Sequence, residues 1–192
     1  MSSKSVLRRG FTAEAERISE RYRRELNISI FDPLNAFRLA DHLEVPVRTV
    51  DNLKLHLPHN VYCILQDPER FSAMCMPNED GDKVILHNDR HSKKRQQSNL
   101  MHELAHVILK HVIPDEAARL CFIFGLHYYS LEQEQEAKYL GGCLQITRPG
   151  LQWALKNNYS TTQISDYYSA STDMVNYRLR VSGVLRQRRY SK

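Results

Sequence analysis

Residues 101–111 read MHELAHVILKH, and this stretch decides how the chain is organised. It places His102, Glu103 and His106 in the order H-E-x-x-H, inside a helical pattern that covers about 92–111. Residues four apart share one face of a helix, so the two imidazoles point the same way. Such a pair can bind one tetrahedral zinc ion, and Glu103 is placed to take a proton from a water that the metal activates. The stretch therefore predicts a metal centre on a helix.

The same histidine spacing also occurs by coincidence in this chain. His87 and His91 are four residues apart, but the residues between them, NDR, follow a strand pattern and contain turn formers. These two side chains therefore need not share a face. His111 follows His106 by five residues, which takes it off the ligand face, and we expect a structural role for it.

A catalytic metal centre needs a third protein ligand, because two histidines alone hold zinc weakly. The acids of LEQEQEAKYLGG, residues 131–142, are Glu132, Glu134 and Glu136. If the segment is a helix, Glu134 shares an apolar face with Ala137, Leu140, Gly141 and Leu144. Glu136 points about 200° away at ~100° per residue. We predict Glu134 as the ligand, with Glu136 as the reserve and a solvated acidic face as the alternative.

The composition is that of a globular chain. Apolar residues make up 42% of its 192 residues, and Gly and Pro number seven each. The longest apolar run, LCFIFGL at 120–126, is too short to cross a membrane, and no apolar segment of a secretion signal follows the N-terminal basic residues. The four cysteines lie far apart, which predicts reduced thiols and a cytoplasmic protein. They are Cys63, Cys75, Cys121 and Cys143.

The net charge of +5 comes from the C-terminal end. Six Lys or Arg residues and no acid follow Asn176, so the rest of the chain is nearly neutral. A general polyanion-binding surface is therefore not expected, whereas a local basic arm is. The alternative for such an arm is a solvated, frayed tail.

The remaining pattern predicts a mixture of helices and strands. Helices are expected over 11–26 and over 32–43, the second with Asp32 as its N-cap. Strands are expected over 45–50, 70–76 and 83–87, with the last two forming an antiparallel pair around the turn PNEDGD. Further helices are expected over 131–146, 148–157 and 161–181. Gly141 and Gly142 inside a helix indicate two helices that approach closely.

Together these motifs resemble a known family. H-E-L-A-H with a downstream E-x-x-A resembles the gluzincin metallopeptidases, and more narrowly the ImmA/IrrE metallo-endopeptidases of bacteria, phages and mobile elements. The similarity covers most of the chain, including RRGFTAEAERISERYRREL, DPLNAFRLADHLEVPV, KVILHN, RQQSNLMHELAHVILKH and EQEAKYLGGCL. The family often ends the last segment with Leu-Leu-Met-Pro where this chain has LQIT, and has Asn or Asp at the position of Lys138.

The resemblance implies a small zincin-like (minigluzincin) domain of the α+β class over residues 1–147. This domain would be helix-rich, with a three- to four-stranded, mostly antiparallel sheet and the metal between two helices. In gluzincins the ligand glutamate precedes the small residue by three, which again selects Glu134. His102, His106 and Glu134 would then hold Zn²⁺, with Mn²⁺ or Fe²⁺ as alternatives, and Glu103 would be the general base.

A further donor should stabilise the oxyanion of the reaction. His127, Tyr128 and Tyr129 are candidates because they are protic residues between the two motifs. The alternative for them is a packing role in an aromatic cluster.

The C-terminal part predicts a separate helical segment. Residues 148–183 carry a pattern like a helix-turn-helix, with Ser169 where a turn Gly is usual, and 184–192 form a basic tail. Arg178 and Arg180 could meet DNA phosphates or a partner. The alternative is a structural cap on the catalytic helices, or a dock for a protein substrate.

These observations predict a cytoplasmic zinc endopeptidase. By resemblance, its substrate would be a helix-turn-helix repressor whose cleavage releases a stress-response or mobile-element programme. The rival is a DNA-binding transcriptional regulator with a zincin-like sensor or inactive body. The intact His102, Glu103 and His106 favour the enzyme, whereas the basic C-terminal segment favours the rival.

Overall fold

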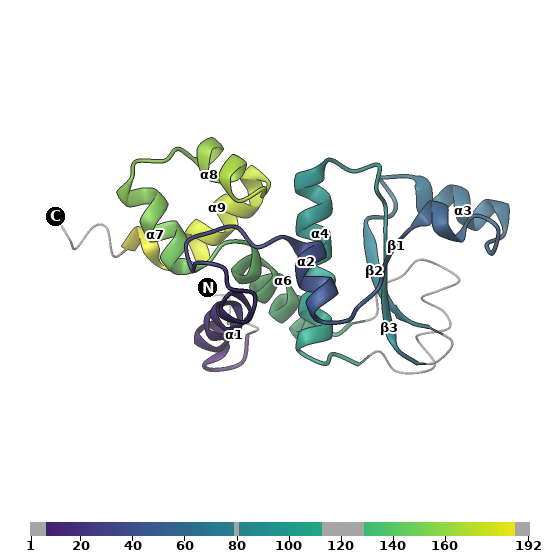
Figure 1. The fold of residues 1–192 in the computed structure, drawn as a ribbon, viewed down its shortest axis with the longest axis horizontal. Helices are drawn as coiled ribbons and strands as arrows, with labels where there is room; N and C mark the ends of the chain where they lie inside the picture. Colours follow the sequence, from purple (N-terminus) through teal and green to yellow (C-terminus); the bar gives the residue numbers. More distant parts are fainter. Residues whose placement is uncertain (1–6, 79–80, 113–128, 187–192) are drawn as a thin grey trace, which may run out of the picture.

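The structure, a computed structural model, describes residues 7–78, 81–112 and 129–186. In these ranges a long helix, α4 (Lys93–Ile108), stands between a small sheet and a pair of helices, α1 (Phe11–Glu25) and α6 (Leu131–Gln145) (Figure 1). A short helix, α2 (Ala36–His42), also packs on α4. This helix-rich arrangement with one small sheet confirms the predicted α+β class.

The sheet of the described residues has the order β1-β3-β2. Its strands are β1 (Val47–Thr49), β2 (Ala73–Pro77) and β3 (Lys83–His87). The predicted antiparallel pair is confirmed, with Cys75 opposite Ile85. However, β1 runs parallel to β3, so the sheet is mixed, and the antiparallel pairing of β2 with β3 is the longer of the two. A parallel pair needs a long crossover, and the chain makes it through a 3₁₀ helix (Val50–Leu53), α3 (His59–Gln66) and β2.

Serine caps fix where the two central helices begin. The side chain of Ser92 accepts the Arg95 N–H at the start of α4, and Ser130 forms a reciprocal capping box with Gln133 at the start of α6. The prediction for α2 is wrong by one turn, because Asn35 rather than Asp32 is its N-cap. Neither the 3₁₀ helix nor α3 was predicted, since both are short.

The core of the domain lies where α4 meets α6. Leu100, Leu104, Leu140 and Leu144 are fully buried there. Gly141 makes the close approach possible, because a Cβ on it would lie only 3.0 Å from the Met101 carbonyl oxygen and 3.2 Å from the His102 nitrogen. The predicted close approach of the two helices is therefore confirmed, and it occurs at His102 itself.

We expect Gly141→Ala to destabilise the fold although alanine is the better helix former. The added methyl group meets backbone atoms of α4, which cannot rotate away, so the helices must move apart at a cost of about 1–3 kcal/mol. The gain in helix propensity is at most ~1 kcal/mol. Urea denaturation of the metal-free variant measures the difference, and a variant at least as stable as the wild type would contradict this packing.

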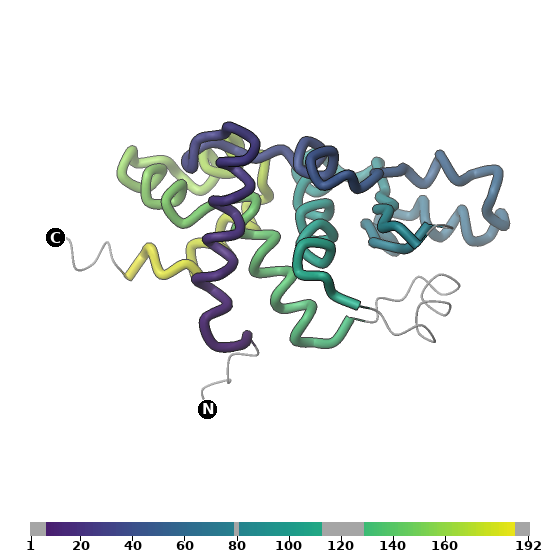
Figure 2. Tube along the Cα trace, turned by 60° about the horizontal axis from the view of Figure 1, so that its bottom comes forward, coloured from purple at the N-terminus to yellow at the C-terminus, as the bar shows by residue number. Residues whose placement is uncertain are grey.

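The C-terminal helices form a layer on the side of α6 away from the sheet (Figure 2). They are α7 (Arg148–Lys156), α8 (Thr161–Tyr167) and α9 (Thr172–Val181). Their buried residues make a cluster of their own, which includes Ile146, Leu151, Ile164 and Val175. The predicted helix over 161–181 is divided in two, with Ser169 in the left-handed conformation (φ 48°) between α8 and α9.

Arg178 joins this layer to the body of the molecule. Its guanidinium is fully buried, donates to the Ile146 carbonyl oxygen at 2.9 Å and pairs with Glu16 of α1 at 2.5 Å. Arg178 therefore does not reach the surface, and its predicted contact with DNA phosphates or a partner is wrong. Arg180 is exposed, and its predicted contact stays a prediction.

We expect Arg178→Ala to lower the free energy of unfolding by about 3–5 kcal/mol, because the change leaves the Glu16 carboxylate without its buried partner. Arg180→Ala, on the same helix but exposed, should change it by less than about 0.5 kcal/mol. Thermal or urea unfolding of both variants tests the assignment. Equal stabilities would mean that Arg178 does not anchor the C-terminal layer.

Two further expectations concern the cysteine thiols and the absence of a membrane span. Cys63, Cys75 and Cys143 carry free thiols, and Cys121 lies outside the described residues. Burial raises the pKa of the Cys75 thiol to about 12, so this group stays protonated and unreactive. Among the described helices, none combines the length and the apolar character that a membrane span requires.

Candidate metal centre

Three side chains from two helices converge at one point. His102 and His106 project from α4, and Glu134 projects from the first turn of α6. The His102 and His106 Nε2 atoms are 3.2 Å apart. The Glu134 carboxylate lies 3.2 Å from His102 Nε2 and 3.6 Å from His106 Nε2. The structure thus brings together the three residues that the sequence predicted as ligands.

The spacing of these atoms fits a tetrahedral metal ion. Ligands at 2.0–2.2 Å from a tetrahedral zinc ion are separated from one another by about 3.3–3.5 Å. The distance of 3.2 Å between the two histidine nitrogens is close to that value, and these nitrogens lie 3.2 Å and 3.6 Å from different oxygens of the Glu134 carboxylate. Two imidazoles and one carboxylate are also a donor set that zinc accepts. Among the described residues, this is the only group of three His, Cys, Asp or Glu side chains so arranged.

A positive charge between these groups is favourable even without a metal. Burial opposes the charged form of His102, but the hydrogen bond with Glu134 and the negative charges of Glu103 and Glu134 outweigh it, so its pKa is raised. The raised pKa favours a proton on His102 when no metal is bound. Metal binding must displace this proton, because a ligating imidazole nitrogen has to be unprotonated.

Glu103 lies beside the three converging side chains but is not one of them, because its carboxylate is bound to β2. Its side chain is buried under β2, where one carboxylate oxygen accepts the Cys75 backbone N–H at 2.9 Å. Burial raises its pKa to about 7, against the positive charge of His102 and the Cys75 N–H, which both lower it. A carboxyl group with a pKa near the operating pH can both accept and return a proton.

A small pocket opens beside the three converging side chains. It has a volume of about 230 Å³ and is lined by Ser72, Ala73, Asn99, His102, Glu103 and Glu134. One wall is therefore the start of β2, and the other is the helix that carries the histidines. The sequence did not indicate Ser72, Ala73 or Asn99, because only the tertiary packing of β2 on α4 brings them here.

An aromatic ring covers the buried histidine. Tyr129 stacks on His106, with ring centroids 3.6 Å apart and an interplanar angle of 17°. Tyr129 therefore packs against His106, which is the packing role that the sequence analysis gave as the alternative for this residue. Its role as an oxyanion donor stays a prediction. The other two candidates, His127 and Tyr128, lie outside the described residues.

The reserve ligand, Glu136, is turned away from the three converging side chains. It is more buried than Glu134, which the helical pattern did not indicate, because His111 and Arg8 cover it. Its carboxylate lies 3.4 Å from His111 Nε2 and 2.9 Å from Arg8 Nε. Lys138, at the position where the resembled family has Asn or Asp, is exposed and lies over the Tyr177 ring.

Comparison with known protein families gives a match. Residues 66–180 match the family described as the IrrE N-terminal-like domain, a peptidase family. The matched range contains α4, α6 and all the side chains that line the pocket. No curated protein matches the chain.

Proposed function

The chain belongs to the peptidase family of IrrE N-terminal-like domains, and on that premise we propose that it is a zinc-dependent endopeptidase. The observation that carries the proposal is the convergence of His102, His106 and Glu134, whose donor atoms lie close enough together to hold one metal ion, with Glu103 next to them. The resemblance of the sequence to gluzincins suggested the same three ligands and the same base.

Each group of the site has a separate role in hydrolysis of the peptide bond. When bound, a zinc ion polarises a carbonyl group and makes water more acidic. Glu103 takes the proton from the attacking water and returns it to the leaving amine. The Cys75 N–H fixes the Glu103 carboxylate on the β2 side of the pocket.

The edge strand β2 is the candidate binding surface for an extended peptide, at the part of its edge that lines the pocket. Ile85 donates its N–H to Pro46, so Cys75 and Ile85 form a non-hydrogen-bonded pair. Hydrogen bonding alternates along an antiparallel ladder, so the Ala73 backbone also faces away from β3. Ala73 lines the pocket, and a substrate strand could pair with it there. This geometry supports a protein or peptide substrate.

We further propose that the substrate is a helix-turn-helix transcriptional repressor, whose cleavage relieves repression of a stress-response or mobile-element programme. This step rests on the resemblance to the ImmA/IrrE peptidases. The rival, a DNA-binding regulator, retains the exposed Arg180 and the basic tail but loses Arg178, which is buried against Glu16.

The direct test uses the purified protein in metal-free and zinc-loaded forms. Each form is incubated with the repressor encoded next to its gene, and the products are analysed by mass spectrometry. We expect a single cut only in the zinc-loaded sample, and removal of zinc by a chelator should stop it. An intact repressor in the zinc-loaded sample, together with tight binding of the protein to operator DNA, would favour the rival.

A further inference from the structure

A line of polar side chains in contact with one another begins at the Nδ1 atom of His106. Its Nδ1 atom, on the side opposite the converging ligands, lies 2.9 Å from His111 Nδ1. His111 Nε2 lies 3.4 Å from a Glu136 oxygen, and the other Glu136 oxygen accepts from Arg8 Nε at 2.9 Å. Arg8 in turn pairs with Glu14, the first acid of α1. Nothing in the proposed reaction uses these groups.

The direction of each hydrogen bond in this line follows from the chemistry of its far end. Arg8 only donates, and the Glu136 carboxylate only accepts. His111 therefore carries its proton on Nε2, and its Nδ1 is an acceptor when the ring is neutral. His106 must then donate from Nδ1, so its Nε2 is the ring nitrogen that carries no proton. That nitrogen faces His102 and Glu134.

We propose that His111 and Glu136 are positioning residues that hold His106 in the tautomer required for metal binding. The proposal rests on the proposed function, because it needs His106 as a ligand. Metal-bound histidines generally donate their second N–H to a fixed acceptor, most often a carboxylate, a backbone carbonyl or a water. Here the acceptor is a second imidazole, which connects His106 to the carboxylate of Glu136.

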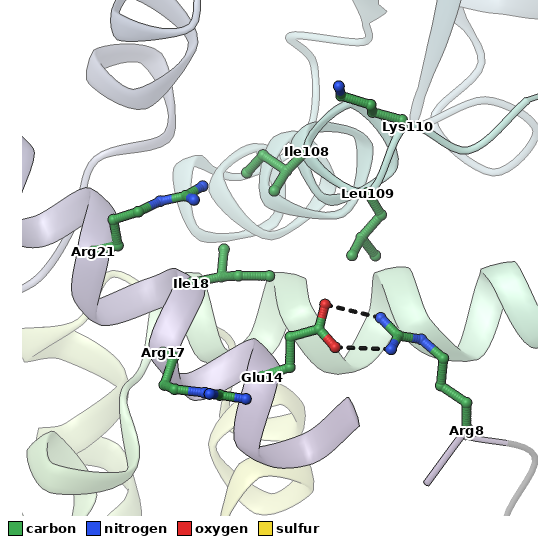
Figure 3. A pocket seen from close by; sticks show the side chains of 8 residues that line it. All are labelled: Arg8, Glu14, Arg17, Ile18, Arg21, Ile108, Leu109 and Lys110. Carbon is green, nitrogen blue, oxygen red and sulfur yellow. Dashed lines mark hydrogen bonds and ion pairs between the residues drawn. The ribbon is translucent and has the colours of Figure 1, made fainter. Parts of the chain in front are cut away.

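Burial decides which members of the line matter most. The side chains of His106, His111 and Glu136 are 1%, 7% and 9% exposed, whereas that of Arg8 is 46% exposed. Figure 3 shows Arg8 at the edge of a surface pocket, with its guanidinium directed at both carboxylate oxygens of Glu14. Water can replace Arg8 in this place but cannot replace His111, so the effect of substitution should fall from His111 to Arg8.

The first measurement is the zinc dissociation constant, obtained by competition with a chromophoric chelator. His111→Phe keeps an aromatic ring but removes the acceptor, and we expect affinity to fall about 10–100-fold. His111→Asn, whose amide oxygen can occupy the place of Nδ1, should recover most of this loss. Arg8→Gln should cost less than threefold. His42→Phe, which removes a histidine–glutamate pair between α2 and α1, is the matched control and should bind zinc like the wild type.

The second measurement needs no substitution. In the ¹⁵N-labelled, zinc-loaded wild type, NMR should detect a scalar coupling across the hydrogen bond between His106 Nδ1 and His111 Nδ1, with the proton on His106. A proton on His111 Nδ1, or no coupling, would overturn the proposal. Wild-type affinity in His111→Phe would do the same. A wild type that binds no zinc would instead refute the proposed function, so the two failures are distinguishable.

Discussion

Glu103→Gln is expected to leave the metal bound and to abolish cleavage of the substrate. The amide keeps the shape of the carboxylate and can still accept the Cys75 N–H, so the pocket should not change. It cannot take a proton from water, and loss of a positioned general base lowers the rate by about 10²–10⁴-fold. Single-turnover cleavage assays on zinc-loaded wild type and variant measure the ratio.

The assay is informative only beside a measurement of bound metal. Metal analysis should give the same zinc content for Glu103→Gln and the wild type, because Glu103 accepts from β2 and is not one of the three converging donors. Cleavage at a rate near that of the wild type would remove Glu103 from the mechanism. Loss of zinc together with activity would instead place Glu103 among the ligands.

Glu134→Ala is expected to weaken zinc binding more strongly than any change in the outer residues. It removes one of three donors and leaves two imidazoles. Substitution of outer partners typically costs 10–100-fold in affinity, so we expect a loss greater than a hundredfold, or more than about 2.7 kcal/mol. Chelator competition at fixed pH measures both constants. Activity should fall in parallel.

Two further variants of α6 serve as comparisons for the zinc affinity of Glu134→Ala. Glu132→Ala removes an exposed carboxylate two residues before Glu134 and should change nothing. Glu136→Ala should have an intermediate effect, because Glu136 acts through His111. If Glu136→Ala abolished zinc binding and Glu134→Ala did not, the ligand assignment would be reversed.

The parts of the site that could be predicted from sequence depend on local spacing. His102 and His106 are one helical turn apart, so their common direction follows from helix geometry alone. Glu134 could be chosen over Glu136 because it shares a helical face with Ala137, Leu140, Gly141 and Leu144, although α6 is buried on most sides from Glu136 onward. Gly141 indicated the close approach of two helices, and a Cβ at that position would meet the backbone of α4.

What could not be predicted depends on contacts between distant segments. From the sequence, Arg178 would be taken for a surface cation. In the structure it is buried in contact with Glu16, which is 162 residues away in the sequence. The line from His106 to Arg8 joins residues 8, 106, 111 and 136, which no local period relates. The parallel pairing of β1 with β3 also escapes the pattern, because strand periodicity gives the faces of a strand but not its neighbours.

The departure at Lys138 has a physical counterpart in the structure. An acid at that position could have supplied a carboxylate partner to a ligating histidine. Because this chain has Lys138 there, its sequence left that partner unidentified. Glu136 supplies a carboxylate instead, through His111 and on the opposite side of His106 from the converging ligands. Outer partners are needed to fix the orientation and the tautomer of a ligating histidine.

The central claim is that three side chains from α4 and α6 hold one divalent cation. A crystal of the zinc-soaked protein, recorded at the zinc absorption edge, tests this claim most directly through an anomalous difference map. We predict one strong peak per chain, within bonding distance of the Nε2 atoms of His102 and His106 and of the Glu134 carboxylate. A peak elsewhere, for instance between His111 and Glu136, or a map without a peak at the three ligands, would contradict it.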